Sequence, residues 1–315
     1  MPELPEVHAL VSDLGARLGG RTIERFEVVS FAALKTFDPT PSTLAGQRIE
    51  SVSRHGKFLD FTVGAPDAAT ERSTPHASAG GGASDGQVHL VLHLARAGWI
   101  RWREGPPPPP SGRPGKGPLA ARLVLADDGI GPAGSGLDIT EAGTKKSLAL
   151  YLVRDAAEVP GIAQLGPDPL DAAFTEEVFA GILAGSGRAQ IKGVLRNQSV
   201  IAGIGNAYSD EILHSARMSP FKPAAMTAEE TSALYSAMQS TLRGAIERAD
   251  GLAASELKRE KKSGLQVHGR TGEPCPVCGD TVRQVTYADS SLQYCPTCQT
   301  GGKPLADRVL SRLLK

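Results

Sequence analysis

Two closely spaced cysteine pairs constrain this chain more than any other feature of its sequence. All four cysteines fall between residues 275 and 298, as Cys275-Pro-Val-Cys278 and Cys295-Pro-Thr-Cys298, with sixteen residues between the pairs. This spacing is typical of a zinc site, in which each pair offers two thiolates to one tetrahedral metal ion. The alternative is a reduced or redox-active set of dithiols. The spacing favours one structural zinc, because four protein ligands leave no open coordination position.

Length and composition set the broad class of the protein. The chain has 315 residues, which favours two domains over one large one, and 40% of them are hydrophobic, enough for a sizeable core. Its 34 basic and 34 acidic residues balance, so any surface that binds nucleic acid must be a local basic patch. The sequence has no apolar run of membrane-spanning length and no signal-peptide pattern. We therefore expect a cytoplasmic protein without a membrane partner.

The first half of the sequence has the pattern of a β-rich domain. A helix is expected over residues 5–17, where apolar residues recur at helical spacing. Two insertions, about 64–87 and 103–119, are rich in Gly, Ala and Ser or contain five consecutive prolines, and we expect them to be disordered. Short apolar runs typical of strands occupy residues 22–29, 48–52, 57–63, 88–94, 99–102, 122–125 and 148–153.

The second half of the sequence changes to a helical pattern after Pro160. Thr227 and Glu230 have the spacing of a capping box ahead of an apolar run. Residues 265–302 are rich in Gly and Cys and strand-like. Helical composition and periodicity are found in residues 175–185, 189–196, 206–216 and 227–249. The predicted fold class is therefore an α+β multidomain protein.

A glycine-bounded turn joins two of the expected helices. Residues 190–211 run from a helix through Gly203-Ile204-Gly205 into a second helix that begins near Asn206. Such a turn allows the backbone to approach a phosphate, and the start of the second helix offers unpaired N–H donors. The other interpretation is a plain helix hairpin that packs a core. The pattern alone favours this second interpretation.

The N-terminus and one isolated lysine carry groups suited to covalent chemistry. The small side chain of Pro2 permits removal of Met1, which exposes a secondary amine. An α-amino group titrates near about pH 8, so part of it is neutral and can attack an aldehydic carbon to form an iminium. Glu3 could move protons beside it. Without further context, Pro2 is more simply an ordinary chain start and Lys57 a solvated surface residue.

Taken together, these residues resemble the formamidopyrimidine-DNA glycosylase/endonuclease VIII family. The opening Met-Pro-Glu-Leu-Pro-Glu-Val is the family's signature, and Gly56 to Leu59, His93-Leu94, Gln198 to Glu211 and the cysteine pairs recur in the family's order. The resemblance covers nearly the whole chain. It implies an N-terminal β-sandwich domain with flanking helices, a helix–two-turn–helix domain and a C-terminal zinc-finger β-hairpin. We place these domains at residues 1–155, 156–262 and 263–315.

The resemblance also implies an activity, base-excision repair of DNA by a glycosylase with abasic-site lyase activity. Pro2 would be the nucleophile at C1′ of the damaged nucleotide, Glu3 the general acid/base and Lys57 a contact to nearby phosphates. Asn206 resembles the family's phosphate-gripping asparagine. Damaged or abasic DNA is the expected partner of a monomer that holds one structural zinc. The residues expected to bind DNA are His93, Arg96, Lys192, Asn206 and Lys258.

Several positions depart from the family's pattern. In the family a methionine usually enters the gap that the flipped-out base leaves in the DNA, and Arg96 stands at that position. Residues 142–147 replace a loop that supplies two further side chains to the same gap. Ser290 stands in place of a zinc-finger arginine. These departures weigh against 8-oxoguanine specificity and leave a catalytically weak DNA-damage-binding protein as the alternative. A zinc-ribbon protein acting on RNA does not explain the N-terminal signature, and retention of Pro2, Glu3 and Lys57 favours the enzyme.

Overall fold

A computed structural model of the chain describes residues 1–65, 86–107, 117–143, 145–288 and 290–306. Most of the two predicted insertions and residues 307–315 lie outside the described residues. The chain divides into two compact units. The first unit contains residues 1–2, 7–163 and 251–255, and the second contains residues 3–6, 164–250 and 256–315. Within the described ranges, no helix is long and apolar enough to cross a bilayer.

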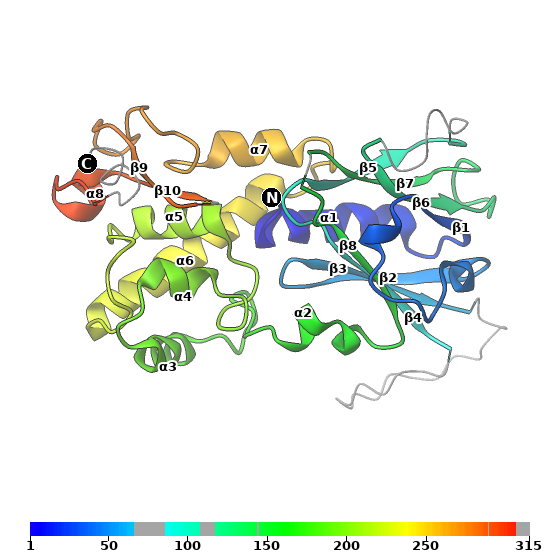
Figure 1. Ribbon diagram of the computed structural model, residues 1–315, viewed down its shortest axis with the longest axis horizontal. Helices are drawn as coiled ribbons and strands as arrows, with labels where there is room; N and C mark the ends of the chain where they lie inside the picture. The colour runs from blue at the N-terminus through cyan, green and yellow to red at the C-terminus, as the bar shows by residue number, and fades with distance from the viewer. Residues whose placement is uncertain (66–85, 108–116, 144, 289, 307–315) are drawn as a thin grey trace. The chain divides into compact units, whose positions relative to one another are not determined.

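The first unit is built on two four-stranded antiparallel sheets, together with α1 (Leu4–Leu18) from Val7 onward (Figure 1). One sheet has the order β1-β6-β7-β5, formed by β1 (Ile23–Val28), β6 (Leu119–Leu125), β7 (Gly136–Glu141) and β5 (Gly98–Arg103). The other has the order β2-β3-β4-β8, formed by β2 (Arg48–His55), β3 (Phe58–Gly64), β4 (Val88–His93) and β8 (Ala149–Val153). The short helices of this unit are η1 (Phe31–Ala33), η2 (Pro41–Leu44), η3 (Ala156–Glu158) and α2 (Pro160–Ala163).

All seven predicted strand runs are confirmed as strands of these sheets. The pattern did not predict β7, which lies between β6 and β5 and pairs with both. Its apolar residues Leu137 and Ile139 alternate with Asp138 and Thr140, as expected of a strand. The signal is short and follows a glycine-rich stretch, so the surrounding sheet, more than the local sequence, decides its conformation.

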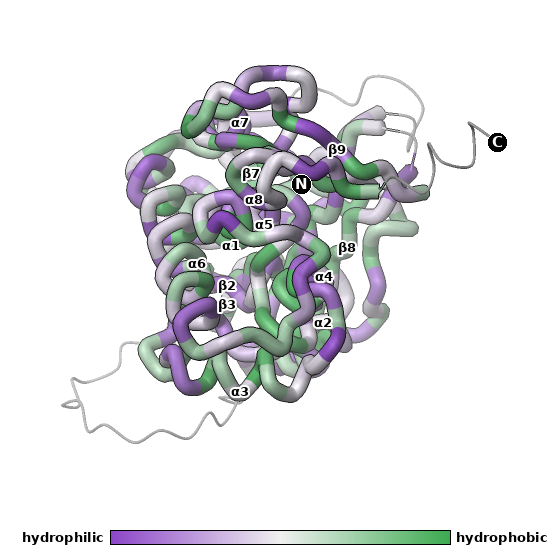
Figure 2. The backbone as a smooth tube through the Cα atoms, turned by 90° about the vertical axis from the view of Figure 1, so that its left-hand side faces the viewer, coloured by the Kyte–Doolittle hydropathy of each residue, from purple (hydrophilic) through white to green (hydrophobic). Residues whose placement is uncertain are grey.

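Helices form most of the second unit, and the first four of them share one apolar core. They are α3 (Glu176–Ser186), α4 (Ile191–Arg196), α5 (Asn206–Ser215), α6 (Ala228–Ala249) and α7 (Leu257–Gly264). The predicted capping box is confirmed at the start of α6, where Thr227 Oγ1 accepts from Glu230 N at 3.3 Å and the Glu230 side chain accepts from Thr227 N at 3.2 Å. Hydrophobic and hydrophilic residues recur in turn along α6 (Figure 2), as expected of a helix with one buried face.

The end of the described chain forms the predicted β-hairpin. Strands β9 (Arg283–Thr286) and β10 (Ser291–Tyr294) pair antiparallel, with Leu292 opposite Val285, and α8 (Pro296–Thr300) follows. Leu292 and Val285 are buried together with Tyr294. The two cysteine pairs flank this hairpin, so its closure brings them together.

Candidate active site and metal centre

The glycine-bounded turn binds a carboxylate that belongs to the chain itself. The Glu3 carboxylate accepts hydrogen bonds from three backbone amides at the start of α5, those of Gly205 at 2.7 Å, Ala207 at 2.9 Å and Tyr208 at 3.2 Å. Bonds of this kind are charge-assisted, and the dipole of a helix favours an anion at its N-terminus. These three amides therefore bind Glu3, whereas the sequence left open whether they contact a phosphate.

Two glycines provide the space for this contact. Gly203 has a φ of +87°, in the left-handed region that favours glycine, and its carbonyl accepts from Leu4 N at 3.0 Å. A Cβ atom on Gly205 would lie 2.4 Å from the Glu3 carboxyl carbon, closer than side chains tolerate. The two glycines thus allow the segment Glu3–Glu6 to lie against the turn.

Glu6 extends this arrangement to the peptide bond that follows Pro2. Its Oε2 accepts the backbone N–H of Glu3 at 2.8 Å, and its Oε1 accepts the hydroxyl of Tyr208 at 2.7 Å. Burial and the charge of Glu6 raise the pKa of Tyr208, which keeps the hydroxyl protonated as a donor. Pro2 is buried. Sequence reasoning missed Glu6, although its position three residues after Glu3 is the spacing of a capping box.

Three of the predicted residues lie at strand ends in the first unit. Lys57 occupies the β2–β3 turn after Gly56, whose φ is +53°, and it is 8% exposed. His93 ends β4, with its ring 4.6 Å from that of Phe58. Burial, and then the charge of Lys57, lowers the pKa of His93 to about 4, so its ring is neutral near pH 7. Arg96 is exposed on the turn after β4. Lys57 and His93 are therefore close enough for the charge of the lysine to act on the pKa of the histidine.

Lys192 belongs to the interior of the second unit, which corrects its expected place on a DNA-facing surface. Its ammonium lies 2.7 Å from both Asp210 Oδ1 and Ser209 Oγ and 3.1 Å from the Asn206 carbonyl oxygen. The side chain is 6% exposed. Burial lowers the pKa of Lys192, and the charge of Asp210 opposes that shift. With its three donors engaged, the ammonium has none left for a phosphate.

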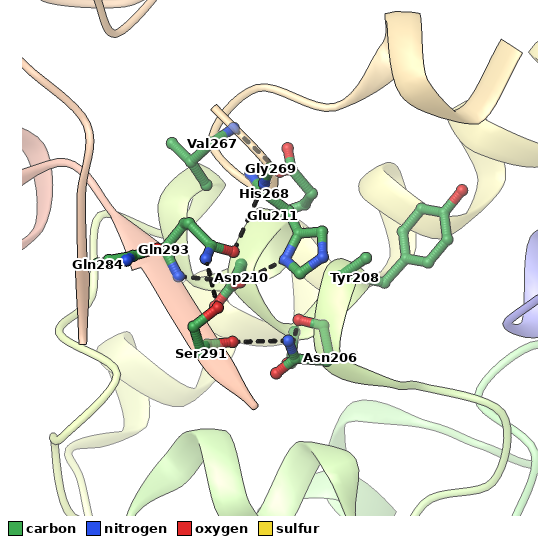
Figure 3. A network of polar contacts seen from close by, with 12 residues as sticks. Asn206, Tyr208, Asp210, Glu211, Val267, His268, Gly269, Gln284, Ser291 and Gln293 are labelled. Atoms are coloured by element: carbon green, nitrogen blue, oxygen red, sulfur yellow. Dashed lines mark hydrogen bonds and ion pairs between the residues drawn. The ribbon is translucent and has the colours of Figure 1, made fainter. Parts of the chain in front are cut away.

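Asp210 and Asn206 connect α5 to the hairpin (Figure 3). Asp210 Oδ2 accepts from Gln293 N at 3.1 Å and lies 2.7 Å from His268 Nδ1. Asn206, the first residue of α5, donates from Nδ2 to the Ser291 carbonyl at 2.7 Å, and its Oδ1 is buried with no hydrogen-bond partner among the described residues. The expected position of Asn206 at a helix start is confirmed, and its contact with a phosphate stays a prediction.

Two further residues of α5 hold the chain around the cysteines. Glu211 accepts backbone N–H groups from residues 266–268 at 2.7, 3.0 and 2.8 Å. Burial raises the pKa of this carboxyl, and the three N–H groups act against the shift. His214 is buried, and its Nε2 lies 3.3 Å from Cys275 Sγ. Sequence reasoning missed both, because each partner lies more than 50 positions away.

The four cysteines form a site that fits one zinc ion. Their sulfur atoms all lie within 4.8 Å of one another, with Cys278 and Cys295 3.3 Å apart and Cys275 and Cys298 3.9 Å apart. Tetrahedral zinc with Zn–S bonds of about 2.3 Å needs sulfur atoms about 3.8 Å apart. Burial raises the pKa of the Cys298 thiol to about 11, so a bound cation is needed to favour its thiolate. The prediction of a structural zinc site is confirmed.

Two further positions named from the sequence lie on α7 and in the hairpin turn. Lys258 is exposed on α7, a helix that the sequence pattern did not predict. Ser290 lies in the β9–β10 turn, where its carbonyl accepts from Tyr287 N at 2.8 Å. In the segment 142–147, Lys146 Nζ donates to the Glu141 carbonyl at 2.5 Å.

Three family models match the chain in the order of its structural parts. They are the formamidopyrimidine-DNA glycosylase N-terminal domain over residues 1–129, the H2TH domain of the same enzymes over 165–256, and a zinc finger found in FPG and IleRS over 272–301. The formamidopyrimidine-DNA glycosylase of Symbiobacterium thermophilum is 32% identical over 312 residues, which are 95% of this chain and 89% of that protein. The chain belongs to the formamidopyrimidine-DNA glycosylase family.

Other members of the family agree in sequence and in structure. An uncharacterized formamidopyrimidine-DNA glycosylase-like protein of Mycobacterium tuberculosis is 58% identical over 160 residues, which are 50% of this chain and 99% of that protein. The crystal structure of MutM (Fpg) from Thermus thermophilus has a TM-score of 0.71 and 31% identity, covering 96% of this chain and 100% of that one. The Lactococcus lactis enzyme, solved non-covalently bound to DNA containing an AP site, has a TM-score of 0.72 and 25% identity and covers 95% and 99%.

Proposed function

We propose that this chain is a base-excision DNA glycosylase that also cleaves abasic sites through its N-terminal proline. The observation that carries the proposal is the fixed position of Glu3, directly after Pro2, under three backbone N–H groups of α5. A carboxylate held beside a potential amine nucleophile is suited to proton transfer during attack and elimination. The Lactococcus lactis enzyme, solved bound to DNA that contains an AP site, supports the substrate class.

The proposed reaction starts once Met1 has been removed and Pro2 has a free secondary amine. Its nitrogen forms a bond to C1′ of the damaged nucleotide as the base leaves with a proton, and the opened sugar becomes an iminium on Pro2. Loss of a C2′ proton then expels the 3′ phosphate, a β-elimination, and a δ-elimination expels the 5′ phosphate. Water releases the sugar remnant from Pro2. Glu3 carries protons to and from the sugar.

The remaining predicted residues would hold the DNA. Lys57, at the β2–β3 turn, and Asn206, at the start of α5, are proposed to contact phosphates near the lesion. Arg96 and Lys258 are exposed cations, and phosphate contacts of such residues add affinity without reading sequence. His93 is proposed as a neutral DNA contact. Zinc would hold the hairpin in place and take no part in the chemistry, because four protein ligands leave no open position.

Borohydride trapping on abasic-site DNA tests the proposal, because only a Schiff base is reduced to a stable covalent link. A protein with an uncleaved N-terminal extension should not be trapped, since its Pro2 nitrogen is an amide. The same preparation should be trapped after proteolysis leaves Pro2 as the first residue. Equal trapping of the extended protein would show that the nucleophile lies elsewhere, with Lys57 the next candidate.

The second candidate is a catalytically weak DNA-damage-binding protein on the same scaffold. It is favoured by Ser290, which offers one neutral hydrogen bond where an arginine would offer a charged fork. Tight binding of abasic DNA by the processed protein, with no trapping, would favour this candidate over the enzyme.

A further inference from the structure

A lysine of α7 lies beside the proposed catalytic glutamate. The ammonium of Lys261 is 2.6 Å from Glu6 Oε2, 4.0 Å from Glu3 Oε1 and 4.7 Å from the centre of the Tyr208 ring. Its side chain is 15% exposed, and those of Glu3 and Glu6 are 3% and 5% exposed. Two buried carboxylates, an aromatic face and one cation therefore form a single cluster within the second unit.

The contacts of Lys261 converge on one oxygen atom. Glu6 Oε2 accepts the backbone N–H of Glu3 as well as the Lys261 ammonium. That N–H belongs to the peptide bond between Pro2 and Glu3. The other oxygen of Glu6 accepts the Tyr208 hydroxyl, and the backbone N–H of Tyr208 donates to Glu3. Glu3, Glu6 and Tyr208 thus form a closed ring of hydrogen bonds, and Lys261 binds the oxygen of Glu6 that holds the Glu3 N–H.

We propose that Lys261 is a positioning residue of this reaction, acting through Glu6 on the peptide that joins Pro2 to Glu3. The inference rests on the proposed function. Its charge offsets that of two neighbouring buried carboxylates, whose repulsion would otherwise move them apart. Removing one partner of a buried pair leaves the other uncompensated, so loss of Lys261 displaces Glu6 and the N–H that Glu6 holds.

The geometry separates this role from that of a DNA-binding lysine. The Lys261 ammonium is paired with a carboxylate and covers the Tyr208 ring, whereas Lys262, the next residue of α7, is exposed. A phosphate contact would change affinity and its salt dependence. A positioning contact changes the rate constant of the bound complex, because a misplaced reacting group lowers the rate without weakening binding.

Single-turnover cleavage of abasic-site DNA at saturating enzyme, with affinity measured separately by fluorescence anisotropy, tests the inference. Lys261→Met should lower the rate constant about 10- to 100-fold, as expected for a displacement of about 1 Å, and change affinity far less. Lys261→Arg should restore most of the rate, since arginine can keep both the ion pair and the ring contact. Lys262→Met, the matched control, removes an equal charge from an exposed position and should keep the wild-type rate constant.

Two outcomes keep this inference distinct from the proposed function. A wild-type protein that is never trapped on abasic DNA overturns the proposed function. If the wild type is trapped but Lys261→Met keeps its rate constant, the Lys261 inference alone is overturned. Should the methionine variant not fold, Lys261→Gln is measured in the same way. Hydrogen exchange of the Glu3 amide adds a readout independent of activity, because Lys261→Met should speed that exchange.

Discussion

Substituting alanine at Gly205 should misplace Glu3 without straining the backbone. Gly205 has a φ of −124°, which alanine adopts readily. The added Cβ would lie 2.4 Å from the carboxyl carbon of Glu3 and 2.6 and 2.7 Å from its oxygens. An ordinary contact is at least 3.4 Å, so the carboxylate must retreat by about 1 Å. That movement breaks or weakens three charge-assisted bonds, each contributing about 1.5–3 kcal/mol.

We expect Gly205→Ala to lower the free energy of unfolding by about 2–4 kcal/mol, because part of the bonding survives relaxation. The single-turnover rate on abasic DNA should fall about 100-fold. Urea denaturation and a quenched-flow assay measure the two effects. Gly193→Ala is the matched control, since Gly193 is exposed on α4 with nothing within 4 Å of an added Cβ. A Gly205→Ala protein with wild-type stability and rate would refute the proposal that the three backbone amides position Glu3.

Three further predictions follow from other parts of the chain. His214→Phe should speed zinc loss to a colorimetric chelator by about 10-fold, because the hydrogen bond to the ligating sulfur of Cys275 is lost; unchanged release would contradict this. The folded-state pKa of His93, about 4, lies below the ordinary value of about 6.5, so the unfolded chain binds a proton first as pH falls. Stability should therefore decline from about pH 6.5 towards pH 4, and His93→Phe should flatten that decline in urea titrations. In side-by-side single-turnover assays, abasic or single-stranded substrates should be cleaved faster than 8-oxoguanine is excised from a duplex. The charged side chain of Arg96 is costly to bury in a base stack, and Ser290 lacks the charged guanidinium with which an arginine would bind a phosphate. A Ser290→Arg variant with higher duplex activity would support that explanation, and the reverse order of substrates would contradict it.

Local patterns predicted most of the regular structure, and the exceptions have a common cause. Helix α7 was missed because Lys258-Arg259-Glu260-Lys261-Lys262 has the composition of a solvated loop. Its conformation depends on contacts distant in sequence, with Leu257 buried at one end and Lys261 paired with Glu6. Strand β7 was missed for the same reason, since its neighbours in the sheet supply most of its stabilisation.

The sequence indicated several residues of the candidate site but not the contacts between them. The N-terminal signature pointed to Glu3, and the glycines pointed to the turn at Gly205, yet their contact spans 202 positions of sequence. No local pattern carries that information. Lys192 was misplaced for a related reason, because a lysine on a short helix is usually solvated and its partner, Asp210, lies 18 positions away. Pairing of charges across the fold is decided by packing, which periodicity does not report.

The use of a helix N-terminus for Glu3 also changes what the glycine-bounded turn can do. Three backbone amides at the start of α5 already bind a carboxylate, and one of the two N–H groups of Asn206 Nδ2 donates to the hairpin. A phosphate that bound these three amides would have to displace Glu3, at a cost comparable to the bonds it gains, whereas the second N–H of Asn206 Nδ2 could donate to a phosphate without displacing a contact. Affinity for DNA should therefore depend on Asn206 and on exposed cations such as Arg96 and Lys258, while the turn controls the position of Glu3. Substitutions in the turn should accordingly lower the rate of the bound complex before they lower affinity, and substitutions of the exposed cations should do the opposite.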